Sequence, residues 1–215
     1  AAEYGFAIPD AVRKLRRPAC SACGLSKRYL FNRTALEGGY AAIATGHNLD
    51  DEAAVLLGNF LHWNSGYLAR QWPVLEASDG LVKKVKPLVR LTERETAAYA
   101  VLTGIDYIIE ECPEAVGARS HLYKEVLNHL EHHSPGTKQQ FLFGFFRYGH
   151  DLFAAADETE LHPCRLCGQP TTSEVCAFCR MTGLLHSDSR QPAAAAHPAI
   201  DPHPAEPHSD PASDG

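Results

Sequence analysis

The sequence predicts an α/β fold with a small metal-binding unit near its C-terminus. Residues 40–45, 81–88 and 105–109 are short runs of strand character, and segments of helical pattern lie between them. Strands and helices in alternation are typical of a parallel sheet with right-handed crossovers. Further along, four cysteines in two closely spaced pairs indicate a zinc ribbon.

Composition and charge support a globular protein with a distinct tail. The 215 residues are 45% hydrophobic and carry a net charge of −6. Five acidic residues and one arginine in 187–215 account for −4 of this charge and leave −2 for residues 1–186, so local basic patches such as 13–17 and 83–86 matter more than the total. The alternative for each patch is an ordinary solvated surface. We expect three parts: a partial α/β domain over 1–157, the ribbon over 158–185 and a disordered tail over 186–215.

Cysteine usage indicates a cytoplasmic protein. The seven cysteines are odd in number and mostly in CxxC spacing, which argues against a secreted disulfide framework and suits a reducing compartment. The sequence contains neither a signal-peptide pattern nor an apolar run as long as a membrane span. It opens Ala1-Ala2-Glu3 without a methionine, so we expect an N-terminally truncated or excised piece of a longer protein.

Helix start and stop signals set the bounds of the expected helices. Pro9 starts the first helix, Gly38 closes the second, and Thr92 with Glu95 forms a capping box at the start of a later one that Gly104 ends. We expect helices over residues 8–15, 23–36, 51–63, 92–102, 119–133 and 138–156.

A polar loop joins the strand over 40–45 to the helix that follows it. The loop reads Thr-Gly-His-Asn-Leu-Asp-Asp-Glu over residues 45–52. Ligands of open α/β sheets bind at the carboxyl ends of strands, and a helix N-terminus favours negative charge, so Asp50 and Asp51 are candidates for chemistry. The alternative is that Asn48 or Asp50 merely caps the helix.

The most specific motif is Cys-x2-Cys-x8-Cys-x2-Cys, which predicts a structural zinc site. Four thiolates in two knuckles close a tetrahedral site and leave no open position for catalysis. The metal would fold a segment that is too short to hold a core of its own. The alternative is a pair of redox dithiols. The four ligands are Cys164, Cys167, Cys176 and Cys179.

Three further cysteines lie outside the ribbon. Cys20 and Cys23 fall at a predicted helix N-terminus, where thiolates are favoured, and Cys112 follows the predicted buried strand over 105–109. Three thiolates could hold an iron-sulfur cluster and leave one iron without a protein ligand. The alternatives are a Cys20/Cys23 redox dithiol with Cys112 as an ordinary buried thiol, or half of a metal site shared in an oligomer.

In combination, these motifs resemble the TtuA-type tRNA 2-thiouridine synthetases of the TtcA/TtuA family. The ordered match runs from Cys20 to Cys179, and it includes Cys-x2-Cys-Gly-x2-Lys, the loop over 45–52, Cys112-Pro113, Ser-Pro-Gly-Thr-Lys over 134–138 and the ribbon. The resemblance implies a Rossmann-like domain of the PP-loop ATPase type. Such an enzyme adenylates the C2 oxygen of a tRNA uridine, and sulfur then displaces AMP.

The resemblance also implies roles for single residues. Cys20, Cys23 and Cys112 would ligate a [4Fe-4S] cluster whose free iron carries the incoming sulfide. Lys27 and Gly46 would contact ATP, and Asp51 would be required for catalysis. The chemistry of Lys27 fits a pyrophosphate leaving group, and that of Asp51 fits Mg²⁺ or the activated uridine. The implied partners are tRNA, a thiocarboxylated ubiquitin-like sulfur carrier and a second copy of the chain.

One departure from the family bears on activity. The family's Ser-Gly-Gly-x-Asp-Ser pyrophosphate loop is not among the 215 residues, nor is the first zinc finger expected before it. We expect both to precede Ala1, and the first strands of the sheet with them. This segment alone would then lack the backbone cradle for phosphates, would not transfer from ATP at a useful rate and would expose an apolar sheet edge.

Two other functions compete with this interpretation. A non-catalytic, metal-binding adaptor that holds RNA or a partner protein would need no phosphate loop. A tRNA cytidine thiolase would keep the fold and change the substrate, but the terminal ribbon argues against it.

Overall fold

A small mixed sheet joins the two halves of the molecule. The computed structural model describes residues 4–15, 18–110, 112–115, 118–153 and 160–186. Within them the sheet has the order β1-β3-β2. β1 and β3 run parallel and β2 and β3 antiparallel, so only one pairing is of the kind that a Rossmann-like sheet requires. The strands are Ala42–Ala44 (β1), Val74–Leu75 (β2) and Lys83–Val85 (β3).

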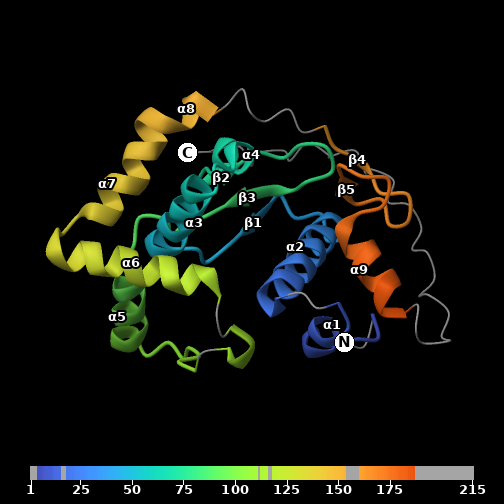
Figure 1. Cartoon of the computed structure of the whole chain (residues 1–215), viewed down its shortest axis with the longest axis horizontal. Coiled ribbons are helices and arrows are strands. Elements are labelled where there is room, and N and C mark those ends of the chain that lie inside the picture. Colours follow the sequence, from blue (N-terminus) through green and yellow to red (C-terminus); the bar gives the residue numbers. More distant parts are fainter. Residues whose placement is uncertain (1–3, 16–17, 111, 116–117, 154–159, 187–215) are drawn as a thin grey trace, which may run out of the picture.

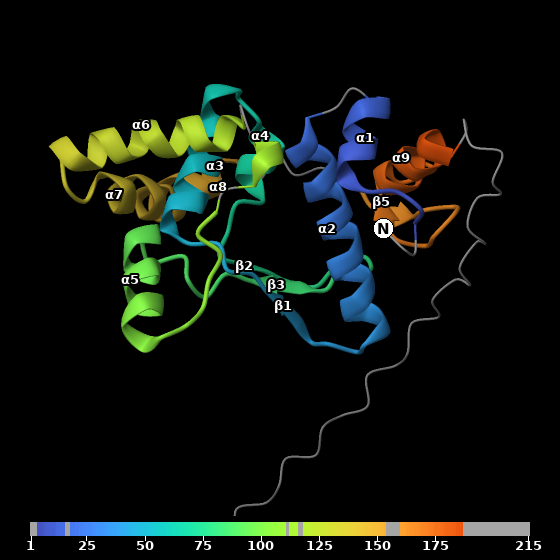
Figure 2. The ribbon, with the colours of Figure 1, turned by 90° about the horizontal axis from the view of Figure 1, so that it is seen from below.

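Helices form two groups around this sheet (Figure 1). One group comprises α1 (Ile8–Leu15), α2 (Ala19–Glu37) and α9 (Ala177–His186), which pack against one another. In the other, α3 packs against α4, α6 and α7. Figure 2 shows α2 and α3 on the same side of the sheet. The helices of the second group are α3 (Leu49–Leu61), α4 (Ser65–Ala69), α6 (Arg119–His133), α7 (Thr137–Gly144) and α8 (His150–Phe153), with α5 (Glu93–Thr103) beside them.

Each group has its own hydrophobic core. Leu49, Leu56 and Leu142 are fully buried where α3 meets α7, and Leu127 of α6 packs on the adjacent face of α3. The other core joins α1 and α2 to the cysteine ribbon, whose strands β4 (His162–Pro163) and β5 (Pro170–Thr171) pair antiparallel.

Local signals predicted several helices well. α1 and α6 have the expected bounds, and α5 has the Thr92 capping box and a left-handed Gly104 at its end, with φ of 67°. The helix expected over 138–156 is built from α7, a π-helical turn η2 (Phe145–Gly149) and α8, and its last three residues lie outside the described part. The predicted tail lies outside it as well, except for residue 186.

Two strand predictions need correction. Residues 105–109 form no strand, and Ile108 and Ile109 are 86% and 77% exposed, because no described strand lies beside them to pair. Cys112 therefore does not follow a buried strand. The strand expected over 40–45 shortens to β1, whose alanines are exposed because it lies at the edge of the sheet with β3 on one side only.

No helix in the described part of the chain is both long and apolar enough to cross a membrane.

Candidate functional site

The N-terminus of α3 carries the acidic residues that the sequence singled out. Asn48 caps the helix: its side chain accepts a hydrogen bond from the Asp51 N–H at 3.0 Å, and its own N–H donates to the Asp51 carboxylate at 3.1 Å. The capping interpretation of Asn48 is thus confirmed. The capping hydrogen bonds leave part of the Asp51 side chain available for other contacts. Its carboxylate also lies 2.7 Å from the Lys124 ammonium, and the side chain remains 29% exposed.

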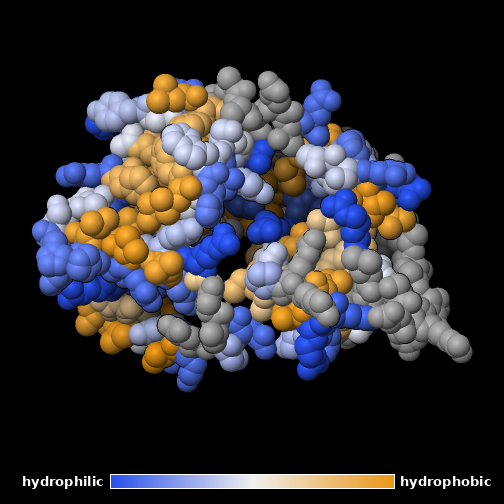
Figure 3. Space-filling model, in the orientation of Figure 1, coloured by the Kyte–Doolittle hydropathy of each residue, from blue (hydrophilic) through white to orange (hydrophobic). Residues whose placement is uncertain are grey.

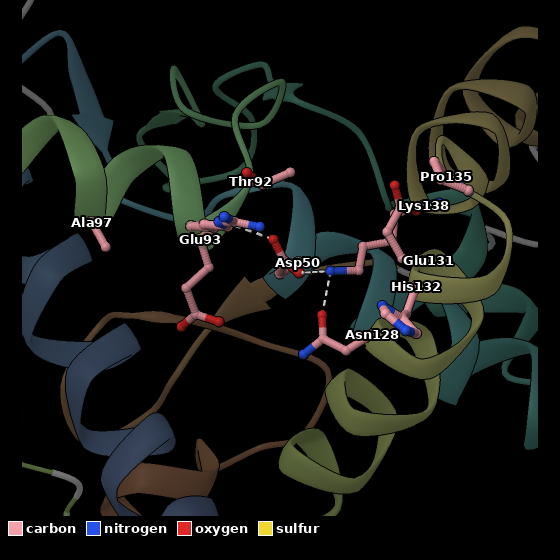
Figure 4. Close-up of a pocket in the computed structure, with 10 residues that line it drawn as sticks. Asp50, Thr92, Glu93, Ala97, Asn128, Glu131, His132, Pro135 and Lys138 are labelled. Atoms are coloured by element: carbon pink, nitrogen blue, oxygen red, sulfur yellow. Dashed lines mark hydrogen bonds and ion pairs between the residues drawn. The ribbon is translucent and has the colours of Figure 1, made fainter.

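Asp50 is buried and joins three segments of the chain. It accepts a hydrogen bond from the Glu93 N–H at 2.7 Å, where α5 begins, and forms an ion pair with Lys138 of α7. The Lys138 ammonium also donates to Asn128 (Figure 4). Both groups of the ion pair are almost fully excluded from solvent, so each depends on the other for compensation of its charge.

The loop before α7 orients this lysine. The Glu131 carboxylate accepts hydrogen bonds from the N–H groups of Gly136 and Lys138, at 2.7 and 2.9 Å. Gly136 adopts the left-handed conformation that such a tight turn needs, with φ of 91°. Sequence reasoning noted this Ser-Pro-Gly-Thr-Lys stretch but missed the pairing of Lys138 with Asp50, since nothing local signals it.

A third ion pair completes the pattern. Glu52 is buried and lies 2.7 Å from the ammonium of Lys86, just after β3. The three consecutive carboxylates of the acidic turn therefore each pair with a lysine from a different segment. Asp51 is the most exposed of the three.

A cavity of about 750 Å³ opens beside Asp50 and Lys138. Its walls come from α5, α6 and the start of α7, and Figure 4 shows the Asp50–Lys138–Asn128 contacts at its polar side. Asp51 is not among the lining residues. The lining residues are Asp50, Thr92, Glu93, Arg94, Ala97, Asn128, Glu131, His132, Pro135 and Lys138.

The residues expected to contact ATP are open to solvent. Gly46 is exposed, and a Cβ built on it would meet none of the described residues within 4 Å. Lys27 is exposed on α2 and makes no hydrogen bond or ion pair with the described residues. The structure therefore leaves both residues accessible but does not bring Lys27 into contact with the acidic turn.

Basic side chains also line the side of the sheet that faces α2 and α3. Lys84 lies on β3 and Lys86 directly follows this strand, two residues further along, so the strand alternation puts Lys84 on the side where Lys86 reaches Glu52. Burial, followed by the charges of Lys86 and Arg28, lowers the pKa of Lys84 against a smaller opposing effect of Glu52, and Lys84 forms no ion pair with the described residues. Figure 3 shows that the molecule is hollowed between the α6 side and the α2 side, with hydrophilic residues around the hollow.

The four ribbon cysteines converge as predicted. Their sulfur atoms lie within 4.8 Å of one another, and Cys164 and Cys176 are buried. Hydrogen bonds from the Cys167 and Cys179 thiols lower the pKa of Cys176 to about 3. Four converging thiols of this kind match the tetrahedral donor set of a structural zinc site.

The other three cysteines are free thiols on neighbouring elements. Cys20 and Cys23 lie in the first turns of α2, and Cys112 directly precedes the turn η1 (Pro113–Ala115), which packs against α2. The described residues do not bring these three sulfurs within the 4.8 Å that the ribbon shows. A [4Fe-4S] cluster spaces its ligands more widely than one metal ion does, and three free thiols on elements in contact are of the donor type that it takes.

Comparison with known proteins gives a consistent relationship. The chain is 53% identical over 188 residues to tRNA-5-methyluridine(54) 2-sulfurtransferase of Thermus thermophilus, covering 87% of this chain and 59% of that protein. It is 50% identical over 180 residues to the Pyrococcus horikoshii protein of the same name, covering 84% and 57%. No protein-family model matches the chain.

A solved structure resembles the fold. It is the U34-tRNA thiolase NcsA of Methanococcus maripaludis with its [4Fe-4S] cluster, with a TM-score of 0.62, 29% identity, and coverage of 75% of this chain and 51% of that one. The chain spans just under three fifths of the length of the two curated relatives described. Over the residues that match, the chain is similar to these tRNA 2-sulfurtransferases and to the thiolase structure.

Proposed function

We propose that this chain is part of an ATP-dependent tRNA sulfurtransferase that makes 2-thiouridine. The observation that supports the proposal is that three free thiols lie on α2 and directly before a turn in contact with α2. Cys20 and Cys23 are on α2, and Cys112 precedes a turn that packs on the same helix. The names of the two sulfurtransferase relatives support the activity.

The proposed reaction has two steps. The C2 oxygen of the uridine attacks the α-phosphorus of ATP, which forms an O–P bond and releases pyrophosphate. Sulfide then forms a bond to C2, and the C2–O bond breaks with AMP as the leaving group, so no oxidant or reductant is needed. Adenylation is required because the unmodified oxygen is a poor leaving group.

Residues of the chain have distinct roles in this proposal. Cys20, Cys23 and Cys112 would hold a [4Fe-4S] cluster, which when bound supplies an iron free to bind sulfide. Lys27 and Gly46 would contact ATP with its Mg²⁺, which their exposure permits. Asp51 would orient the uridine or the Mg²⁺ through the part of its carboxylate that stays exposed.

The ribbon and the partners complete the proposal. Cys164, Cys167, Cys176 and Cys179 would bind a structural zinc ion, and the ribbon over 158–185 would be one folding unit beside the α/β part over 1–157. The substrate is tRNA. A thiocarboxylated ubiquitin-like protein would deliver sulfur, a second copy of the chain would form a homodimer, and the reduced thiols suit the cytoplasm.

Anaerobic reconstitution with iron and sulfide tests the cysteine assignment. The 215-residue chain should gain visible absorbance and, on reduction, an electron paramagnetic resonance signal of a [4Fe-4S] cluster. Cys112→Ala should abolish both. Ser21→Ala is the matched control, because Ser21 is an exposed residue of α2 between the two helix cysteines. If Cys112→Ala retains the full signal, the assignment is wrong.

The proposed thiolation is tested in an extended version of the chain that includes a Ser-Gly-Gly-x-Asp-Ser segment.

One observation favours the adaptor function instead: all three carboxylates of the acidic turn are engaged in ion pairs. Salt-dependent tRNA binding without any thiolation by the extended version would support the adaptor and reject the enzyme.

A further inference from the structure

Helix α2 has two opposite faces with different neighbours. At 3.6 residues per turn, Cys20, Cys23 and Lys27 share one face, and Ala22, Leu25, Tyr29 and Asn32 lie about 170° away on the other. Cys20 and Lys27 are exposed, whereas Ala22, Tyr29 and Asn32 are buried. The face opposite the cysteines is therefore the more deeply buried one.

The cysteine ribbon packs on this buried face. The Phe178 ring stacks on the Tyr29 ring, with centroids 3.9 Å apart and planes 11° from parallel. The Tyr4 ring packs edge-on against the Phe178 ring, with ring centroids 5.0 Å apart. The Tyr29 hydroxyl lies beside the thiol of Cys167, one of the four ribbon cysteines, so α2 reaches the edge of the metal site itself.

Asn32 adds a polar link one turn further along α2. Its amide nitrogen donates to the Gln169 side chain of the ribbon at 2.8 Å and to the Gly80 carbonyl at 3.0 Å, and its oxygen accepts from the Val82 N–H at 2.9 Å. Asn32 and Gln169 are both buried. One side chain thus joins α2, the turn before β3 and the ribbon, and the loss of any partner would leave buried polar atoms without hydrogen bonds.

We propose that the metal-loaded ribbon is a brace that positions α2, so that metal binding at the four ribbon cysteines fixes where Cys20 and Cys23 stand. The two strands of the ribbon are only two residues long each, and a segment of this size keeps its fold through its metal. On metal loss, Phe178 and Gln169 would leave the back of α2. Tyr29 and Asn32 are then positioning residues. The cluster part of this inference rests on the proposed function, and the brace itself does not.

Amide hydrogen exchange of the 215-residue chain tests the brace without any activity assay. Removal of zinc with a chelator should speed exchange in α2 by about tenfold or more and leave α3 and α6 nearly unchanged. Added zinc should restore the protection. Unchanged exchange in α2 after verified zinc loss would overturn the proposal, and so would equal acceleration in all helices, because that would mean general unfolding.

Two ribbon variants separate the brace from the metal. Phe178→Leu removes the ring stack on Tyr29, and Gln169→Leu removes the hydrogen bond from Asn32. Both variants keep all four ribbon thiols. Arg165→Ala is the matched control, because its ion pair with Glu174, at 3.4 Å, lies on the exposed side of the ribbon. All three should retain one zinc per chain, and only the first two should speed exchange in α2 and lower the yield of reconstituted cluster severalfold.

The outcomes distinguish the brace from the cluster assignment. Faster α2 exchange with a lower cluster yield and intact zinc supports the inference. Normal exchange or normal cluster yield in both variants overturns it. A cluster that survives Cys112→Ala would reject the assigned ligands, while the exchange response of α2 would still report on the brace.

Discussion

The ammonium of Lys124 lies 2.7 Å from the carboxylate of Asp51 and 3.2 Å from that of Glu93. Lys124 therefore connects α6 to the starts of α3 and α5. Burial alone would lower the pKa of Lys124, but the hydrogen bonds and charges of Asp51 and Glu93 outweigh it and raise the pKa. The lysine stays protonated at neutral pH and holds Asp51 at the mouth of the acidic turn.

Lys124→Met should markedly slow the proposed thiolation and only slightly lower the stability of the fold. The ion pair is partly exposed, so its removal should cost at most about 1 kcal/mol of unfolding free energy. In the extended version, loss of the positioning of Asp51 should reduce kcat about tenfold, with little change in the KM for tRNA. Lys124→Arg should restore most of the rate. A change in KM alone would show that Lys124 binds substrate and does not position Asp51.

The buried pair of Asp50 and Lys138 should behave differently. Lys138→Met leaves a buried carboxylate without its counter-ion and should cost about 3–5 kcal/mol of unfolding free energy. Asp50→Asn combined with Lys138→Met should cost clearly less than the sum of the single changes, because the two groups are coupled. Urea unfolding measures all three variants. Additive losses would show that the two charges do not compensate each other.

Gly46→Ala tests whether Gly46 contacts ATP or is instead required for the backbone conformation. No residue in the described part of the chain lies within 4 Å of an added Cβ, so the unfolding free energy should change by less than about 0.5 kcal/mol. If ATP approaches this backbone, the extended version should bind Mg-ATP about tenfold more weakly by calorimetry. Gly104→Ala is the opposite control. Its φ of 67° makes alanine strained, so it should lose stability and keep its affinity for ATP.

Features encoded within a few residues could be predicted from the sequence. The Thr92–Glu95 capping box, Pro9 and the ribbon spacing each act over one or two turns of chain, and the structure has the helices and the thiol cluster that they indicate. The acidic turn was also found from sequence, as the start of a helix after a strand.

Features that depend on distant partners could not be predicted. Lys138 meets Asp50 across 88 positions, and Asn32 meets Gln169 across 137, so no window of sequence contains either pair. The run over 105–109 has the composition of a buried strand, but a strand needs a neighbour, and none among the described residues lies beside it. Burial is decided by such tertiary contacts.

Lys84→Met should weaken tRNA binding while leaving the fold intact or more stable. The pKa of Lys84 is lowered by burial and by nearby Lys86 and Arg28, so the folded chain binds this proton less tightly than the unfolded chain does. The charged lysine therefore costs stability at neutral pH, and stability should rise as the pH climbs through the folded pKa of Lys84.

A phosphate bound beside Lys84 would offset the repulsion from Lys86 and Arg28. The slope of log K against log salt for tRNA binding should then fall by about 1 in Lys84→Met. Lys83→Met is the matched control, because Lys83 points to the opposite face of β3 and pairs with Glu76 at 3.1 Å. An equal change of slope in both variants would mean that the whole basic strand attracts RNA non-specifically. A changed slope in Lys84→Met alone would place a phosphate on the face of the sheet between α2 and α3.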